Sequence, residues 1–442
     1  MIERAGPNDL MQLATDVGPV PMHIAAIVLL DPGIGFDLDT AVVLVGQRLG
    51  RIPRLRRRLV RPPIGCGPAY WLDDATFDPS HHIQVTECPC PGDESALLDT
   101  ALALAATTLP RSRPMWSATF VTGLARGRVA LVLVMHHVVA DGLGALAVIG
   151  ELVDDGSAPL TAPQTRFPRP VPSRRALAID AWTTRLHAIS ELPGRLPQLI
   201  PAVAELRTVR RRWAPRTSLN RPTGPRRQAR LARTDLAAAL NAAHAQGGTV
   251  NDVILTAVVG AVGDLLEARG ETVRRLIVSV PVSSRSPGDR VQIGNHVGVM
   301  LTALPVGGDP LALLKAVVGI TRDQKKRRRP EASATLLQPA FRALGRVGIL
   351  SWCINHQRLV NTFVTNVPGP KLPVTFMDAR VTDVIPIAGA AGNATVAFAV
   401  LSYDGVLTVT VVADPDAVPE LQQLTASLQR ELDALTSPHS TT

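Results

Sequence analysis

The sequence predicts a mixed α/β (α+β) fold built in two halves, and three observations support this prediction. Short apolar runs rich in β-branched residues, typical of buried strands, alternate with longer stretches of helical character in both halves. Between the halves, from residue 154 to about residue 225, proline is frequent and arginine is dense. The chain has 442 residues, 46% of them hydrophobic and 19% charged, which is enough for two globular domains. We therefore expect an N-terminal domain at 1–155, a linker with helices at 156–225 and a C-terminal domain at 226–442.

The first half begins with a strand, because an apolar run follows Val20-Pro21 and is stopped by Asp31-Pro32-Gly33. Later apolar runs lie on either side of Gly127, which is typical of two strands joined by a turn. In chain order we expect a strand at 24–30, helices at 38–49 and 94–108, strands at 115–122 and 129–135, and a helix at 143–153.

Two helical stretches in the linker, 176–191 and 200–213, are separated by prolines. In the second half, Thr249 or Asn251 is expected to cap a long apolar helix that ends near Ala268. The other expected elements are a helix at 234–246, strands at 275–282 and 297–305, a helix from 309, strands at 361–366, 379–386, 394–403 and 406–413, and a closing helix at 418–435.

The charge and the cysteine content narrow the class of protein. A formal charge of +9, from 46 basic against 37 acidic residues, could attract nucleic acid, anionic lipid or a phosphorylated ligand. Nucleic acid is not expected, because aromatic residues are only 3% of the chain and no recognition motif is present. Four cysteines in so long a chain do not form a disulfide framework, and the N-terminus lacks the apolar core of a signal peptide. We expect a cytoplasmic protein, with peripheral binding to the inner face of the membrane or to a lipid-droplet surface left open.

The most informative motif is HHxxxDG at residues 136–142, which follows a buried strand and precedes a helix. Loops at the ends of rigid strands are common places for catalytic side chains, although paired histidines can also be ordinary core residues. No metal site is expected, because the chain has no CxxC or HExxH motif and Cys88-Pro89-Cys90 has the wrong spacing for zinc. The chain also lacks a GxSxG elbow, a P-loop and a GxGxxG loop.

Further blocks follow in a fixed order along nearly the whole chain. They are PMH at 21–23, RPMW at 113–116, TVND at 249–252, VPVSSR at 280–285, GN at 294–295, TNVPGP at 365–370 and LSYDG at 401–405. With HHxxxDG, these blocks make the sequence resemble the bacterial wax ester synthase/diacylglycerol acyltransferases. That family belongs to the CoA-dependent acyltransferases, which include chloramphenicol acetyltransferase and the condensation domains of peptide synthetases. Pro110 stands where the family has aspartate, and residues 388–393 are richer in alanine and glycine than is usual there.

The resemblance implies a fold of two chloramphenicol-acetyltransferase-like domains, each a mixed sheet flanked by helices, with a channel between them. It implies acyl transfer from a CoA thioester to an alcohol, with acyl-CoA as co-substrate and no tightly bound cofactor. The second histidine of the motif, His137, would be the general base, a contribution of roughly 10²–10⁴-fold. His136 would support it by orienting the loop or by lining the channel. The CoA phosphates would have to meet scattered basic side chains, of which the run at 325–329 is one candidate.

For Asp141 we favour a structural role over polarising His137, and Arg285 is the expected salt-bridge partner. Gly142 would permit a close backbone approach or would be an ordinary loop glycine. Asn251 would donate to the oxyanion or position the acceptor, or would only cap its helix.

The remaining candidates are expected to shape the substrate path. Trp116 and Pro114 would pack along the acyl channel. His23 would line the same channel or be a satisfied core histidine. Asn295 would contact substrate or support its loop.

The expected substrates are acyl-CoA and diacylglycerol, with fatty alcohols as a second acceptor. Alternatives are an acyltransferase for another hydroxyl or amine acceptor, and a lipid-binding protein without turnover. Because such acceptors reside in membranes, a surface that touches lipid is expected, and residues 203–213 have the pattern of an interfacial amphipathic helix. The alternative is that this apolar stripe packs on the protein itself.

Overall fold

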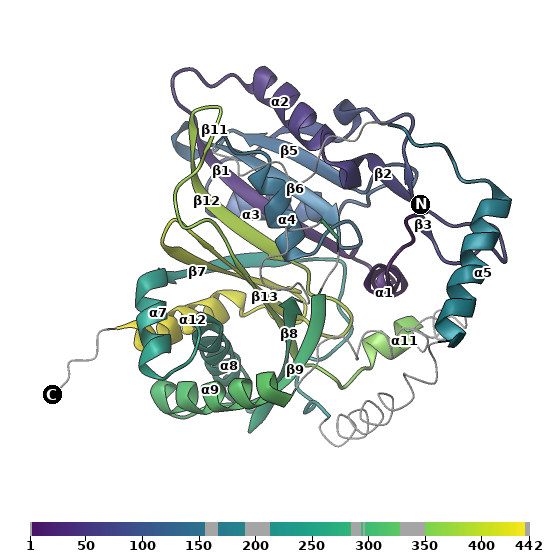
Figure 1. Ribbon diagram of the computed structural model, residues 1–442. Coiled ribbons are helices and arrows are strands. Elements are labelled where there is room, and N and C mark those ends of the chain that lie inside the picture. The colour runs from purple at the N-terminus through teal and green to yellow at the C-terminus, as the bar shows by residue number, and fades with distance from the viewer. Residues whose placement is uncertain are drawn as a thin grey trace.

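The computed structural model describes residues 2–154, 167–190, 213–283, 293–294, 297–327 and 350–437. In this part of the chain, two six-stranded sheets are each covered by helices, and a two-stranded ribbon lies beside the first sheet (Figure 1). The ribbon consists of β2 (Arg57–Val60) and β3 (Tyr70–Asp73). The α/β fold class predicted from the sequence is confirmed.

The first sheet holds the strand that ends at the HHxxxDG motif. Neighbouring strands of this sheet run antiparallel, except for β4 and β5 at one edge, which run parallel. The two central strands are apolar and almost completely buried, as expected for strands covered on both faces. The strand order is β11 (Thr375–Phe376), β12 (Ala379–Ala388), β1 (His23–Asp31), β6 (Val129–His136), β5 (Trp116–Thr122) and β4 (Ile83–Glu87).

The second sheet has the same number of strands and is also mixed. The strand β10 pairs parallel with both of its neighbours, and the other pairs are antiparallel. The strand order is β7 (Gln228–Asp235), β14 (Val406–Ala413), β13 (Val396–Tyr403), β10 (Thr362–Pro368), β8 (Arg275–Ser283) and β9 (Val297–Pro305).

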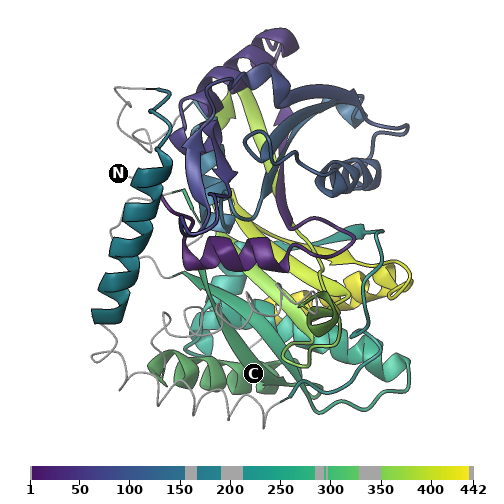
Figure 2. The ribbon, with the colours of Figure 1, turned by 90° about the vertical axis from the view of Figure 1, so that its right-hand side faces the viewer.

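Helices cover both sheets (Figure 2). In the first half they are α1 (Pro7–Thr15), α2 (Leu38–Gly50), α3 (Glu94–Ala106), α4 (Gly142–Gly150) and α5 (Arg174–Ser190). In the second half they are α7 (Leu236–Ala245), α8 (Val250–Ala268), α9 (Pro310–Arg327), α11 (Leu350–Asn355) and α12 (Leu421–Thr436).

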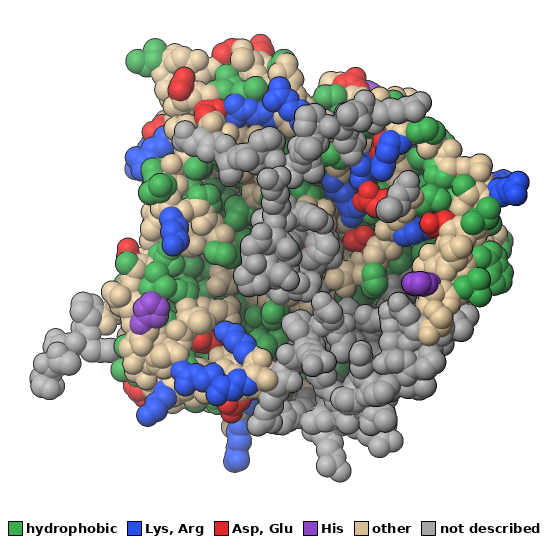
Figure 3. Space-filling view, viewed as in Figure 1, with side chains coloured by type: hydrophobic (Ala, Val, Ile, Leu, Met, Phe, Trp, Pro, Cys, Tyr) green, Lys and Arg blue, Asp and Glu red, His purple; other side chains and the backbone are tan. Residues whose placement is uncertain are grey.

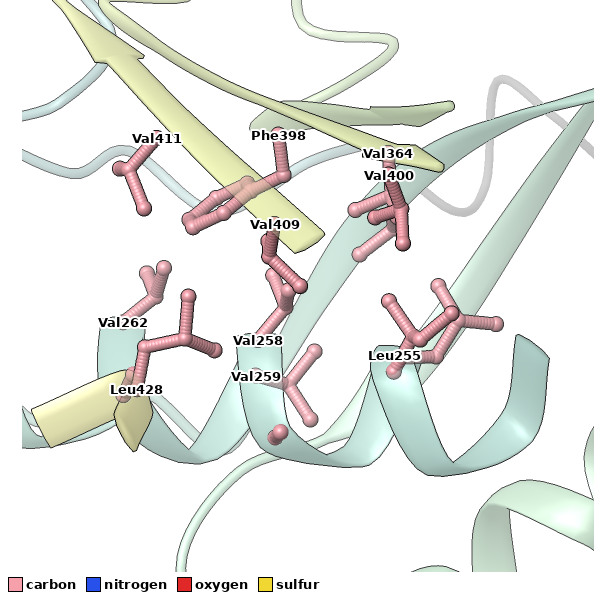
Figure 4. Packing of buried hydrophobic residues seen from close by; sticks show 14 of the residues in the cluster. Leu255, Val258, Val259, Val262, Val364, Phe398, Val400, Val409, Val411 and Leu428 are labelled. Carbon is pink, nitrogen blue, oxygen red and sulfur yellow. The ribbon is translucent and has the colours of Figure 1, made fainter. Parts of the chain in front are cut away.

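The helix α8 forms the centre of the second core, because thirteen of its nineteen residues are buried. Figure 4 shows its aliphatic side chains pointing at valines of three strands and at Phe398. Full burial of such side chains contributes about 1.5–3 kcal/mol each, so this helix is fixed firmly on the sheet. Its N-terminus is therefore a rigid support for the residues that begin it.

The two halves of the chain are interlocked. The strands β11 and β12 come from the second half, yet they complete the first sheet, where β12 pairs with β1 (Figure 1). A third core cluster mixes Ile385 of β12 and Val412 of β14 with residues of the first half. Arg233 of β7 also forms salt bridges to Glu94 and Asp383. The prediction of a C-terminal domain at 226–442 did not include the addition of β11 and β12 to the first sheet. The domain boundaries remain a prediction.

Most predicted elements are confirmed within one to three residues. The elements that were not predicted from the sequence are short or polar: α1, β2, β3, β4, β7, β11 and α11. The predicted helix at 200–213 lies outside the described residues except for Trp213.

Within the described ranges, no single helix combines the length and the apolar composition needed to cross a membrane. The pair α7 and α8 meets those criteria only when its helices are taken together, across a bend of 94°.

Candidate active site

His137 lies at the exit of β6, one residue beyond the end of the strand. Its backbone N–H donates to the carbonyl of Met22 at 2.8 Å, so the first strand of the sheet fixes its position. The side chain is partly exposed, whereas its Nδ1 is buried and makes no regular hydrogen bond within the described residues. Nε2 makes no hydrogen bond within the described residues, so its lone pair is not used by the protein there.

Burial lowers the pKa of His137 below its usual value of 6.5. The ring's interaction with the carbonyl of the same residue and the charge of Asp141 both raise this pKa, but burial outweighs them. The imidazole is therefore neutral at pH 7, which is the form that can accept a proton.

His136 is buried and is held by hydrogen bonds on both ring nitrogens. Nδ1 accepts from the backbone N–H of Val138 at 3.1 Å, so Nδ1 carries no hydrogen and Nε2 donates to Oδ2 of Asp16 at 3.2 Å. Because both nitrogens are used in this way, His136 has no free lone pair for a substrate. The two adjacent histidines therefore differ: both ring nitrogens of His136 are hydrogen-bonded, whereas Nε2 of His137 has no such bond in the described residues.

Asp16 was not singled out from the sequence, and it is the anion that orients His136. Burial raises its pKa, but hydrogen bonds from His136, from the Met22 N–H at 3.1 Å and from Arg111 at 2.8 Å outweigh burial and hold the pKa far below its usual value. Asp16 follows α1 in an irregular segment, where no periodicity marks it. A carboxylate five residues before the PMH block was the only available signal.

His23 stands beside His136, with ring centroids 5.7 Å apart in an edge-on arrangement. Its Nδ1 donates to the carbonyl of Ala105 at 2.8 Å, and burial lowers its pKa. This is the geometry of a satisfied, neutral core histidine, one of the two alternatives left by the sequence.

The RPMW block holds the motif from the other side. His136 N–H donates to the carbonyl of Met115 at 3.0 Å. Trp116 is 1% exposed, stacks on His82 with centroids 4.4 Å apart, and donates its indole N–H to the carbonyl of Leu55 at 2.8 Å. Pro114 is buried and accepts from the Trp116 N–H. This block supports the strand end by packing, and a direct contact with substrate remains a prediction.

Asp141 is fully buried and caps α4. Its Oδ1 accepts from the Gly144 N–H at 2.8 Å, and its own N–H donates to the carbonyl of Gly294 at 3.2 Å. An aspartate at a helix N-cap is favoured both by the hydrogen bond and by the helix dipole. These contacts agree with a structural role for Asp141. Its predicted partner Arg285 lies outside the described residues, as does Asn295.

Gly142 lies where the two halves touch. A Cβ there would be 2.8 Å from Cγ2 of Val367, in the TNVPGP block of β10. The Gly142 position therefore needs a residue without a side chain, which supports the close-approach alternative.

Asn251 is in the first turn of α8, but it is not the cap. The cap is Thr249, whose N–H and Oγ1 both donate to Oδ2 of Asp252 at 2.8 Å. Asn251 is half-buried and its amide makes no hydrogen bond within the described residues. The capping role proposed for Asn251 is therefore wrong, and a role toward substrate remains a prediction.

No group of three or more His, Cys, Asp or Glu side chains in the described ranges is arranged to hold a metal ion.

Comparisons with known proteins assign this arrangement to a family. Residues 6–254 match the model of the wax ester synthase/diacylglycerol acyltransferase catalytic domain, and residues 293–436 match the model of the C-terminal domain of the same family. A protein of Mycobacterium tuberculosis (strain ATCC 25618 / H37Rv) named as a probable diacylglycerol O-acyltransferase is 29% identical over 428 residues, which is 93% of this chain and 90% of that protein. A putative diacylglycerol O-acyltransferase of Mycobacterium tuberculosis (strain CDC 1551 / Oshkosh) is 26% identical over 451 residues, covering 97% and 94%.

Solved structures show the same fold. The wax ester synthase/diacylglycerol acyltransferase from Marinobacter aquaeolei VT8 aligns with a TM-score of 0.69 at 22% identity, over 98% of both chains. The first condensation domain of the calcium-dependent antibiotic synthetase aligns with a TM-score of 0.63 at 18% identity, over 99% of this chain and 96% of that one. With both family models matched in order on a chain that carries HHxxxDG at the end of β6, the protein belongs to the wax ester synthase/diacylglycerol acyltransferase family and is an acyltransferase.

Proposed function

We propose that this protein transfers the acyl group of an acyl-CoA to the hydroxyl of diacylglycerol, and in a second activity to that of a fatty alcohol, with His137 as the general base. The observation that carries the proposal is the imidazole of His137, which lies partly exposed at the end of a buried strand and whose pKa is lowered by burial. The names of the mycobacterial relatives support diacylglycerol as the acceptor.

The reaction needs a base because a hydroxyl is a weak nucleophile at neutral pH. Nε2 of His137 takes the hydroxyl proton as the oxygen attacks the thioester carbonyl, and the tetrahedral oxyanion then collapses. The C–S bond breaks, and the CoA sulfur leaves and takes up the proton from the imidazolium. Asn251, whose amide is free within the described residues, would donate to the oxyanion.

The neighbours of His137 act on its position. His136 is locked between Asp16 and the Val138 N–H, so the backbone preceding His137 cannot shift. Asp141 closes the loop on its other side by capping α4. Both are positioning residues in this proposal, because their polar atoms are bonded to the protein.

The direct test compares His137→Ala with His244→Ala, an exposed histidine in the last turn of α7. With palmitoyl-CoA and dioleoylglycerol, His137→Ala should lower kcat by roughly 10²–10⁴-fold, whereas His244→Ala should leave kcat unchanged. Circular dichroism and the melting temperature verify that both variants fold. A folded His137→Ala protein that keeps most of the wild-type turnover contradicts the assignment.

Acceptor choice is tested with a panel of diacylglycerol, hexadecanol and an alkyl amine, read by thin-layer chromatography of labelled product. Triacylglycerol as the main product supports the proposal, and a main amide product points to the alternative acceptor class. Absence of any product, with retained lipid binding, points to a non-catalytic protein.

We also propose that α5 binds an anionic lipid surface, because the acceptors reside in one. Ile179, Trp182 and Leu186 are 54%, 58% and 62% exposed and fall on one face at helical spacing, opposite the buried Leu177 and Ala181. Exposed arginines flank this face, and Arg185 lies 5.3 Å from the Trp182 ring centroid. Apolar side chains ringed by cations suit anionic headgroups.

The lipid proposal is tested by flotation with vesicles containing phosphatidylglycerol. Wild type should float, and Ile179→Ser/Trp182→Ser/Leu186→Ser should remain at the bottom. The matched control removes three exposed apolar side chains elsewhere, Ile34→Ser/Val43→Ser/Val85→Ser. Equal flotation of the two triple variants contradicts a role for α5.

A further inference from the structure

A basic cavity of about 380 Å³ lies where the turn between α7 and α8 meets the last turns of α9. This volume falls within the range of small-molecule sites, about 300–1,000 Å³. In Figure 3, Lys and Arg side chains gather over α9. The cavity is lined by Gly247, Gly248, Thr249 and Asp252 on one side and by Val318, Thr321, Arg322, Lys325 and Lys326 of α9 on the other.

The charges around this cavity favour an anion. Arg322, Lys325 and Lys326 are exposed and lie on one face of α9 at i, i+3 and i+4. Asp252 is the single carboxylate in the lining, and it is 2% exposed. Its oxygens already accept from the Thr249 N–H, the Thr249 hydroxyl and, at 2.7 Å, the Thr321 hydroxyl. The three cations therefore outnumber one internally satisfied carboxylate.

The start of α8 forms one wall of the cavity. The positive end of the dipole of this nineteen-residue helix lies there and favours an anion. Gly248 lets the turn approach α9, because a Cβ at that position would be 2.5 Å from Cγ2 of Val318. Arg322 ties the two sides together by donating to the carbonyl of Gly247 at 2.6 Å.

The cavity is at the end of the second sheet that faces the HHxxxDG loop. Ser283 at the end of β8 pairs with Val297 at the start of β9, and Gly294 just before β9 accepts from the Asp141 N–H. Because short connections join α8 to β8 and β9 to α9, the start of α8 and the end of α9 both lie toward this edge. Thr302 of β9 donates to Gln324 of α9 at 2.8 Å, which anchors the last turns of α9 on that strand.

We propose that this cavity binds the 3′-phosphate of the acyl-CoA adenosine, which leaves the pantetheine arm to carry the thioester toward His137. The assignment rests on the proposed function for its choice of CoA as the phosphate source. A terminal phosphate monoester carries close to two negative charges and several acceptor oxygens, which suits a cluster of three cations beside the positive end of a helix dipole.

The test uses palmitoyl-CoA and 3′-dephospho-palmitoyl-CoA with wild type and with Lys325→Glu/Lys326→Glu. Wild type should show a KM about tenfold lower for palmitoyl-CoA than for the dephospho analogue, the ratio expected from one charge-assisted contact. The variant should raise the KM for palmitoyl-CoA to that of the analogue, with kcat and the KM of the analogue unchanged. The control Lys315→Glu/Lys371→Glu makes the same charge change at exposed lysines outside the cavity and should keep the wild-type ratio.

Calorimetric titration with CoA, 3′-dephospho-CoA and inorganic phosphate separates this site from catalysis. If wild type does not turn over palmitoyl-CoA but binds CoA more tightly than dephospho-CoA, and the variant loses that difference, the proposed function fails and the site stands. The site assignment is overturned if wild type does not distinguish the two thioesters, or if the variant and the control raise KM alike. Inorganic phosphate that competes as well as CoA, mole for mole, assigns the cavity to free phosphate instead.

Discussion

At the scale of single residues, His136 and His137 have the same side chain but different hydrogen-bonding environments. The first ring has both nitrogens occupied, and the second keeps Nε2 open. The difference arises because the strand ends between them and the chain turns, so that one ring points at Asp16 and the other does not. One imidazole is therefore held by the protein, and the other keeps Nε2 without a hydrogen bond in the described residues, as the base role that we propose for it requires.

The lowered pKa of His137 predicts the acid side of the pH–rate profile. The base must be neutral, and burial favours the neutral ring, so the midpoint of the acid decline in kcat/KM should lie below pH 6.5. The same sign holds for stability, because the unfolded chain binds this proton more readily: the contribution of His137 is complete above pH 6.5 and is lost as the pH falls below it.

The measurement is kcat/KM for palmitoyl-CoA from about pH 4.5 to pH 8 under conditions where the protein stays folded. The residual activity of His137→Ala should lack the acid decline. A decline centred above pH 6.5 would contradict a buried neutral base.

At the residue scale, the sequence predicted the motif histidines but not their partner. Asp16 lies in an irregular segment and meets His136 only through the fold, so no local pattern could identify it. The distinction between the two roles of Asn251 also required the structure, because Thr249 and Asn251 are both good capping residues and only their backbone geometry decides.

At the scale of elements, the start of α8 holds both the cap of the helix, Thr249, and the candidate site residue Asn251. Thr249 donates two hydrogen bonds to the Asp252 carboxylate across the first turn, which fixes the backbone on both sides of Asn251. The cap thereby supports both the candidate residue Asn251 and the lining of the basic cavity.

Replacing Thr249 with alanine should therefore lower the free energy of unfolding by about 1 kcal/mol, the usual contribution of an N-cap. The control Thr107→Ala, at the exposed C-terminal end of α3, should stay within about 0.5 kcal/mol of wild type. Urea denaturation followed by circular dichroism measures both values. Equal changes in the free energy of unfolding for the two substitutions would contradict a stabilising role of the α8 cap.

Elements with strong apolar periodicity were predictable, and those held by tertiary contacts were not. The strands β6, β13 and β14 are continuous buried runs, which the sequence displays directly. The strand β7 (QARLARTD) is half polar, because it is a sheet edge whose Arg233 forms salt bridges to Glu94 and Asp383. β4 is likewise an edge strand with exposed residues, and the two-residue strand β11 is too short to show a pattern.

At the scale of the whole molecule, the two halves meet at Gly142 and Val367. The substitution Gly142→Ala should force the two blocks apart, because the added carbon would be 2.8 Å from Cγ2 of Val367. Overpacking of this kind typically costs 1–3 kcal/mol, about the loss expected here. Activity should fall with it, because Gly142 is the first residue of the helix that follows the catalytic loop.

The double variant Gly142→Ala/Val367→Ala should recover part of the lost stability and activity. A double-mutant cycle from chemical denaturation and kcat measures the coupling between the two positions. Additive losses would mean that the contact between these blocks does not govern either property. The predicted channel between the halves remains a prediction.

The membership of β12 in the first sheet has a consequence for biosynthesis. On the ribosome, β1 is synthesised long before its partner strand, because Ala388 follows Ile24 by 364 positions in the chain (388 − 24). Until then, the open edge of β1 is a template for pairing with other nascent chains. The first sheet therefore stays incomplete for a long interval of synthesis, and slower elongation would lengthen the exposure of this edge.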